Sequence, residues 1–179
     1  MNFEERVNKL YQDYPVQPYI AVDRDLGGWF LKGKPVPRRN MLPLEGGLLA
    51  GDIILLWRIQ FGTFTTESVY PKYFEYTYGI NAEDRLSHLL MNDYVILDSP
   101  FESLRHLNTT IKKNILKSKN VTGLSKMKSV DLNQALENYF SEEELGKHFS
   151  IRGYRLTEKG RLALLDNQDV VDRHPKKSF

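Results

Sequence analysis

The spacing of apolar and polar residues predicts a chain that is mainly helical. The strongest pattern covers residues 129–140, where apolar side chains lie at i, i+3, i+4, i+7 and i+8 counted from Leu132. This spacing gives a helix one continuous apolar face. Weaker versions of the pattern predict helices over residues 1–14, with Asn2 as the cap, and over residues 109–119. In the second of these, Ile111 and Ile115 are expected to face inward and Lys112, Lys113 and Lys117 to face away from them.

Residues 52–97 predict three more helices followed by a strand. In chain order we expect a buried helix over residues 53–61 capped by Asp52, a short helix near residues 70–78, a third helix capped by Asn81, and a strand at Tyr94–Leu97. The aromatic run within residues 70–78 could stack nucleic-acid bases, but its density is more typical of a core or an interface.

The C-terminal part predicts a strand at Tyr154–Leu156 that runs into a helix capped by Thr157, with Leu162 and Leu165 on its apolar face. Earlier in the chain, directly after the predicted helix over residues 129–140, Ser141 and Glu144 fit a capping box that opens a short acidic helix.

The two short strands are expected to pair with each other. Tyr94–Leu97 and Tyr154–Leu156 each adjoin a helix whose leucines need a common core, and a two-stranded ribbon is stable only when it packs on such a core. Antiparallel pairing would make residues 100–150 a compact helical excursion that leaves and returns at one place. Closing so long a loop costs little more than closing a shorter one.

Residues 15–51 are rich in glycine and proline and predict a loop-rich arm, with short strands at Tyr19–Val22 and Trp29–Leu31. Asp23 and Asp25 are interpreted as turn residues. The glycines do not fit a phosphate loop of the Walker type, because no Gly-Lys-Ser/Thr follows them.

Two features resemble a winged-helix domain. They are the step from Leu89-Leu90 to Asp93-Tyr94-Val95 after the third helix, and the run Tyr154-Arg155-Leu156-Thr157-Glu158-Lys159-Gly160 on the returning strand. The resemblance implies a hairpin after the third helix, here with residues 100–150 inserted in it. Winged helices commonly contact DNA through the third helix, but Glu83 and Asp84 at its start disfavour phosphate.

The segment between the strands resembles the SAP domain, a helix–extended loop–helix module that binds DNA and in some cases RNA. The matching residues are Leu104, Leu107, Ile111, Lys112, Ile115, Leu116, Lys128, Asp131 and Leu132; Asn120-Val121 and Met127 depart from the pattern. The run that ends in Leu-Thr-Glu-Lys-Gly also looks like uncharacterised bacterial and phage proteins with a SAP-like domain.

Charge is distributed unevenly along the 179 residues. Residues 1–102 carry 10 Lys/Arg and 14 Asp/Glu, whereas residues 103–130 carry seven bases and no acid. An acid-free basic segment is the pattern expected of a phosphate-binding surface. The candidate nucleic-acid-binding residues are Arg105, Lys112, Lys113, Lys117, Lys119, Lys126 and Lys128. Six of the seven are lysines, which predicts affinity with little sequence specificity.

Composition excludes several other classes of protein. The chain has no cysteine, which excludes a disulfide scaffold and a thiolate metal site and fits a reducing compartment. Its four histidines have no metal-ligand spacing, and no catalytic motif is present. No apolar stretch approaches the roughly 20 residues that span a bilayer. We therefore predict a cytoplasmic, non-enzymatic protein with no catalytic residue, metal, cofactor or membrane contact.

These observations predict a mainly α (α+β) fold in three parts. Residues 1–51 are the N-terminal helix and arm, residues 52–99 with 150–179 are the winged-helix-like core with its short β-ribbon, and residues 100–149 are the SAP-like segment. The predicted function is low-specificity nucleic-acid binding, to DNA rather than RNA, through the lysine-rich segment. The alternative is a protein-interaction module that acts through the winged helix, by partner binding or homodimerisation.

Overall fold

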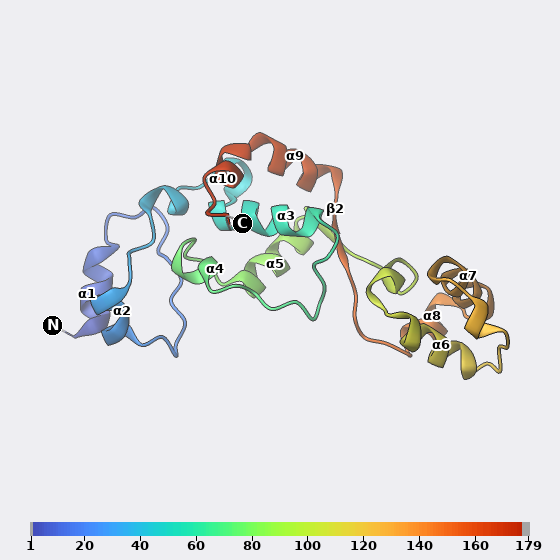
Figure 1. Ribbon diagram of the computed structural model, residues 1–179. Coiled ribbons are helices and arrows are strands. Elements are labelled where there is room, and N and C mark those ends of the chain that lie inside the picture. Colours follow the sequence, from blue (N-terminus) through green and yellow to red (C-terminus); the bar gives the residue numbers. More distant parts are fainter. Residues whose placement is uncertain (1, 177–179) are drawn as a thin grey trace. The chain divides into compact units, whose positions relative to one another are not determined.

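The structure, a computed structural model, describes residues 2–176 and is mainly helical with one small β-ribbon (Figure 1). The chain divides into two compact units. Unit 1 comprises Met1–Gln60, Val69–Val95 and Leu156–Phe179, and unit 2 comprises Phe61–Ser68 and Ile96–Arg155. Two of the boundaries between the units fall within the strands of the ribbon, one between Val95 and Ile96 and the other between Arg155 and Leu156.

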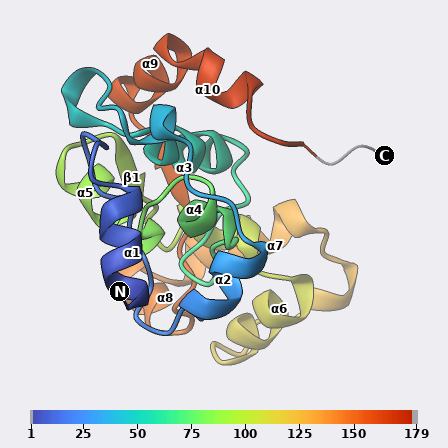
Figure 2. The same ribbon diagram turned by 90° about the vertical axis from the view of Figure 1, so that its left-hand side faces the viewer.

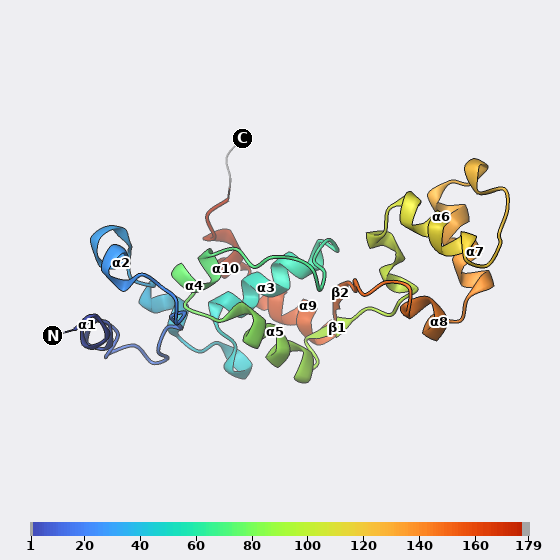
Figure 3. The ribbon, with the colours of Figure 1, turned by 90° about the horizontal axis from the view of Figure 1, so that it is seen from below.

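Unit 1 contains most of the helices. They are α1 (Phe3–Leu10), α2 (Leu26–Lys32), α3 (Ala50–Gln60), α4 (Tyr73–Tyr76), α5 (Ala82–Met91), α9 (Glu158–Asp166) and α10 (Gln168–Asp172), with 3₁₀ turns η1 (Arg38–Met41) and η2 (Glu45–Gly47). Helix α3 lies at the centre and packs against α5, α9, α10 and η1 (Figure 3). Because α3 is apolar on nearly every side, it is buried along most of its length, as predicted.

Asp52 lies inside α3 instead of in front of it, which corrects the predicted cap. Helix α3 begins at Ala50, and Asp52 is its third residue, where the carboxylate accepts a hydrogen bond from the backbone N–H of Leu49 at 2.8 Å. The other predicted caps are confirmed. Asn2, Asn81, Ser141 and Thr157 each accept a bond from a backbone N–H in the first turn of their helix.

The two predicted strands do pair. β1 (Val95–Leu97) and β2 (Tyr154–Leu156) form a two-stranded sheet. The backbone N–H of Asp98 donates to Gly153 O at 2.9 Å and that of Thr157 donates to Tyr94 O at 3.1 Å, so the register is antiparallel. Helices α3, α4 and α5 followed by this ribbon do not by themselves show a winged helix, so the winged-helix resemblance stays a prediction.

Side chains of the Leu-Thr-Glu-Lys-Gly run, residues 156–160, form hydrogen bonds that join the start of α9 to the residues directly after α5. The Thr157 hydroxyl donates to Asp93 O at 2.5 Å, and the Lys159 ammonium donates to Asn92 O at 2.8 Å. A Cβ on Gly160 would lie 2.0 Å from Tyr94 O, so only glycine fits there. The run therefore holds α9 close against the chain before β1.

Two predictions about unit 1 are wrong. Leu162 and Leu165 are 44% and 59% exposed, and α9 buries Gly160 and Leu164 instead, because the close contact of Gly160 with Tyr94 fixes the rotation of the helix. Trp29–Leu31 belongs to helix α2, which the Asp25 side chain caps by accepting from Gly28 N–H, and Tyr19–Val22 forms no strand.

Helices α1 and α2 lie beside each other (Figure 2). Their aromatic rings meet, with Phe3 stacked on Phe30 at a centroid separation of 5.7 Å and Arg6 above Phe30. The arm thus contains a helix, α2, that its glycine and proline content did not predict.

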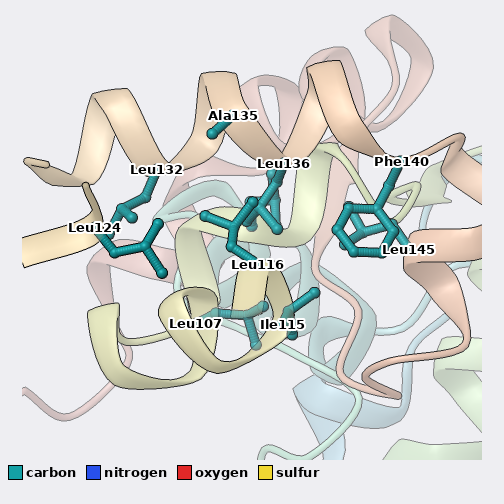
Figure 4. Packing of buried hydrophobic residues seen from close by; sticks show 10 residues of the cluster. Leu107, Ile115, Leu116, Leu124, Leu132, Ala135, Leu136, Phe140 and Leu145 are labelled. Atoms are coloured by element: carbon teal, nitrogen blue, oxygen red, sulfur yellow. The ribbon is translucent and has the colours of Figure 1, made fainter. Parts of the chain in front are cut away.

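Unit 2 is built on its own apolar core. Its elements after β1 are η3 (Glu102–His106), α6 (Thr109–Lys117), η4 (Leu124–Lys126), α7 (Ser129–Tyr139) and α8 (Glu142–Gly146). Ten buried side chains from these elements and their connections pack together: Leu104, Leu107, Ile115, Leu116, Leu124, Leu132, Ala135, Leu136, Phe140 and Leu145 (Figure 4). The apolar pattern predicted for residues 129–140 supplies four of them.

Among the described residues, no helix is both long enough and apolar enough to cross a membrane. The most buried helix, α3, has 11 residues.

Candidate nucleic-acid interface

Helices α6 and α7 run in the same direction. The Lys112 ammonium, in the first half of α6, donates to the Ser129 hydroxyl at the start of α7 at 3.2 Å. Beyond the other end of α6, the Lys119 ammonium lies 5.0 Å from the ring centre of Phe140, just after α7. Two parallel helices need a connection that returns along the pair, and residues 118–128 make it. This connection carries three of the seven candidate bases.

The lysines of α6 and the residues just after it lie on two flanks. The side of α6 that faces α7 carries Lys112, Ile115, Leu116 and then Lys119, and the first three are buried. Lys113 and Lys117, four residues apart, lie on a different flank of the helix. The structure therefore divides the basic residues of this segment into those turned toward α7 and those turned away from it.

Lys112 is buried, which corrects the prediction that it faces solvent. It is 2% exposed, whereas Ile111, expected to face inward, is 40% exposed. Burial lowers the pKa of Lys112, because the charged ammonium loses its hydration and gains only the Ser129 hydroxyl in return. A side chain in this position does not reach a phosphate on the protein surface.

Lys119 is engaged by an acid. Its ammonium donates to Glu144 Oε2 at 2.9 Å, beside the ring of Phe140. The hydrogen bond from Lys119, with bonds from the backbone and side chain of Ser141, lowers the pKa of Glu144 to about 2. The positive charge of Lys119 is therefore offset within unit 2.

Arg105 is also engaged within unit 2. Its guanidinium donates to the Asp98 carboxylate at 2.7 Å and to the backbone carbonyl of Glu102 at 2.6 Å. Asp98 is buried, so the pair fixes the guanidinium at the base of the excursion. A bidentate contact from Arg105 to a base would require these bonds to break.

Four of the seven candidates keep free ammonium groups. Lys117, Lys126 and Lys128 are exposed and Lys113 is partly exposed, and within residues 2–176 none of the four has a hydrogen bond or ion pair from its ammonium. Lys126 lies in η4 and Lys128 directly precedes α7, where its backbone N–H donates to Asp131 at 3.0 Å. The connection that carries them turns at Asn120 and Gly123, both with positive φ.

Helix α5, the third helix of the winged-helix comparison, uses its one arginine internally. Arg85 donates to both carboxylate oxygens of Asp52, at 2.8 and 2.6 Å, and this bond raises the pKa of Arg85. Glu83 and Asp84 occupy the first turn. Of the bases on α5, only the partly exposed His88 is without a carboxylate partner in the described chain.

The aromatic run near α4 is largely core. Phe74 and Tyr78 are 1% and 2% exposed, whereas Tyr76 is 43% exposed. The Tyr78 hydroxyl lies 2.5 Å from His174 Nδ1, so this histidine is a packing residue of unit 1. No group of three or more metal-ligating side chains occurs in the described part of the chain.

A second basic run without acids was not predicted from the sequence. Residues 26–44 contain Lys32, Lys34, Arg38 and Arg39 and no acid, but the acidic balance of residues 1–102 as a whole conceals them. All four are exposed. Counting charge in shorter windows would have detected this run.

Comparisons of the chain with protein-family models, with curated proteins and with solved structures give no significant match.

Proposed function

We propose that unit 2 binds nucleic acid with low sequence specificity, DNA in preference to RNA, through Lys113, Lys117, Lys126 and Lys128. The observation that carries the proposal is that residues 103–130 form a 28-residue stretch without acids in a helical unit, and that the bases of this stretch left without an intramolecular partner in the described chain are these four lysines. Each ammonium that neutralises a phosphate releases condensed counterions, which favours binding.

Low specificity follows from the kind of side chain that is free. An ammonium is a point charge that suits phosphate oxygens, whereas bidentate base contacts need a guanidinium or an amide. Arg105 is occupied by Asp98. The SAP-like resemblance supports the same function, and the parallel helices joined by a long return segment are compatible with that module.

The test is a fluorescence-anisotropy titration of a 20-base-pair DNA duplex of mixed sequence at several salt concentrations. Four phosphate contacts should give a slope of log affinity against log salt of about −3.6. Replacing all four lysines with Gln should remove most of the affinity. Among single changes, Lys117→Gln should weaken binding, while Lys147→Gln, an exposed lysine of the same unit outside the acid-free segment, should not.

Binding that is independent of salt, or equal effects of Lys117→Gln and Lys147→Gln, would contradict the proposal. Lys112 is left out of this set because a change at a buried position would also affect folding.

Self-association through α9 is a second candidate function. Lys159, Leu162, Ala163 and Asp166 line one side of a cavity of about 510 Å³ in unit 1, and Leu162 is 44% exposed. If two copies packed antiparallel along this row, Lys159 would meet the partner subunit's Asp166. Light scattering should then show a dimer that Leu162→Glu dissociates; a monomer at all concentrations would remove this candidate.

A further inference from the structure

The arm of unit 1 contains a pocket of about 430 Å³ between α2 and the end of α4. Its walls include Arg24, Trp29 and Tyr76, and its rim carries Lys32 and Lys34. None of these residues belongs to the lysine-rich segment of unit 2. The pocket therefore combines aromatic rings with exposed lysine side chains, and substitutions can test the rings and the lysines separately.

The inner wall of the pocket is held by an ion pair. Arg24 donates from Nε to Glu75 Oε2 at 2.5 Å, and the side chain of Arg24 is 3% exposed. Its guanidinium lies 5.4 Å from the ring centre of Trp29 and 4.8 Å from that of Tyr76. The ion pair offsets the charge of Arg24 and holds the guanidinium between the two rings, so a ligand meets planar surfaces that are already in place.

Gly33 brings the two rim lysines to the edge of Trp29. A Cβ on Gly33 would lie 2.2 Å from Trp29 Cδ1, and the Gly33 N–H donates to Trp29 O at 2.6 Å. The backbone can cross the indole edge this closely only at a glycine. Lys32 and Lys34, the residues on either side, are thereby fixed at the mouth of the pocket.

The rim is positively charged. Lys32 and Lys34 are exposed, and no carboxylate pairs with either ammonium within the described residues. The carboxylate that does line the pocket, Asp25, is used to cap α2 through Gly28 N–H at 3.1 Å. An anion at the mouth therefore meets two free ammonium groups.

We propose that this pocket binds an unpaired nucleotide of a single strand, with the base against the exposed side of Tyr76, next to Trp29, and the adjacent phosphates at Lys32 and Lys34. Base stacking on aromatic rings together with lysines that track the backbone is the general chemistry of single-strand binding. Tyr76, 43% exposed, offers the accessible ring. The proposal uses residues that are separate from those assigned to duplex binding.

The chain has two tryptophans, which provides a direct test. With Trp57→Phe as the background, Trp29 is the sole indole, and its fluorescence should be quenched when an eight-residue oligodeoxyadenylate binds. The same protein with the four unit 2 lysines replaced by Gln should show the same quenching, which separates this site from the proposed duplex surface.

Variants then assign the contacts. Lys32→Gln with Lys34→Gln should weaken the oligonucleotide about tenfold at low salt and reduce the salt slope by about 1.4. Tyr76→Ala should weaken binding with the salt slope unchanged, and Lys147→Gln should have no effect. AMP and the oligonucleotide compared at equal nucleotide concentration distinguish a free nucleotide from a strand as the source of the ligand.

Absence of quenching by both AMP and the oligonucleotide would overturn the proposal. Equal quenching of Trp29 fluorescence by inorganic polyphosphate would also overturn it, since that result would show that the base makes no contact.

Discussion

Two buried charged residues in this protein are accommodated in opposite ways. Asp52 is fully buried but accepts two hydrogen bonds from Arg85 and one from Leu49, so its charge is compensated. Lys112 is equally inaccessible and has only the hydroxyl of Ser129. The first arrangement stabilises the contact between α3 and α5, and the second leaves an ammonium whose desolvation is poorly offset.

The burial of Lys112 predicts that its replacement by methionine stabilises unit 2. Methionine fills a similar volume without the desolvation penalty, so Lys112→Met should raise the free energy of unfolding at pH 7 by about 1 kcal/mol. Urea denaturation measures this, and Lys113→Met at the partly exposed neighbour should change it by less than about 0.5 kcal/mol.

The same comparison has a pH dependence of known sign. The pKa of Lys112 is lower in the folded than in the unfolded chain, so the unfolded chain binds more protons below pH 10.5. Stability of the wild type should therefore rise relative to Lys112→Met as the pH increases toward 10.5. A difference that is constant with pH would show that Lys112 is hydrated.

The lowered pKa of His174 predicts that the protein loses stability in acid. Burial, followed by the charges of Lys176 and Arg58, lowers the pKa of His174 below 6.5. The unfolded chain then binds more protons below pH 6.5, so stability falls as the pH falls through this range. The difference in Tm between the wild type and His174→Asn should shrink between pH 7 and pH 5; a constant difference contradicts the assignment.

At the scale of elements, glycine at position 160 decides how α9 packs. The contact of Gly160 with Tyr94 O leaves no room for a Cβ and turns Leu164 inward. Leu162 and Leu165 therefore remain exposed. The sequence of residues 162–165 alone would allow the helix to bury either these two leucines or Leu164.

Gly160→Ala should therefore destabilise unit 1 by about 1–3 kcal/mol through overpacking. Gly27→Ala is the matched control, since it also lies within a helix but its Cβ would meet Phe3 only at an ordinary 3.4 Å. That control should be neutral or slightly stabilising, because alanine has the higher helix propensity. Equal urea midpoints for the two variants would show that α9 can shift away from Tyr94.

On the scale of the whole molecule, the β-ribbon contains two of the points where the chain passes between units. The ten core residues of unit 2 all lie between Leu104 and Leu145, inside the segment bounded by the strands. Residues 61–68 add contacts of their own, including the bond from Thr66 N–H to Arg152 O at 2.9 Å. Unit 2 thus has a core that does not depend on the apolar residues of unit 1.

Residues 96–155 expressed alone should consequently show helical circular dichroism, melt cooperatively and keep most of the duplex affinity. Leu116→Asp in the same fragment places a charge in the core and should abolish the melting transition. A fragment that is unstructured without residues 61–68 would mean that these contacts are required for folding.

The sequence by itself determined the local structure of most helices and the pairing of the strands. Caps such as Asn81 and Thr157 act within a few residues, and the spacing of Leu132, Ala135 and Leu136 sets one face of α7, so neither needs distant information. The acid-free segment that carries the candidate site was likewise evident from composition. The helix α2 was missed because the glycines of the arm masked the cap at Asp25.

Only the tertiary structure decided which bases of that segment remain free. In α6, Ile111 and Lys112 are adjacent and either could face inward; Lys112 is buried because the start of α7 lies over it. Lys119 and Arg105 are removed from the free set by Glu144 and Asp98, which lie 25 and seven residues away in sequence. Such partners are fixed by packing between elements, and local spacing along the chain carries no information about them.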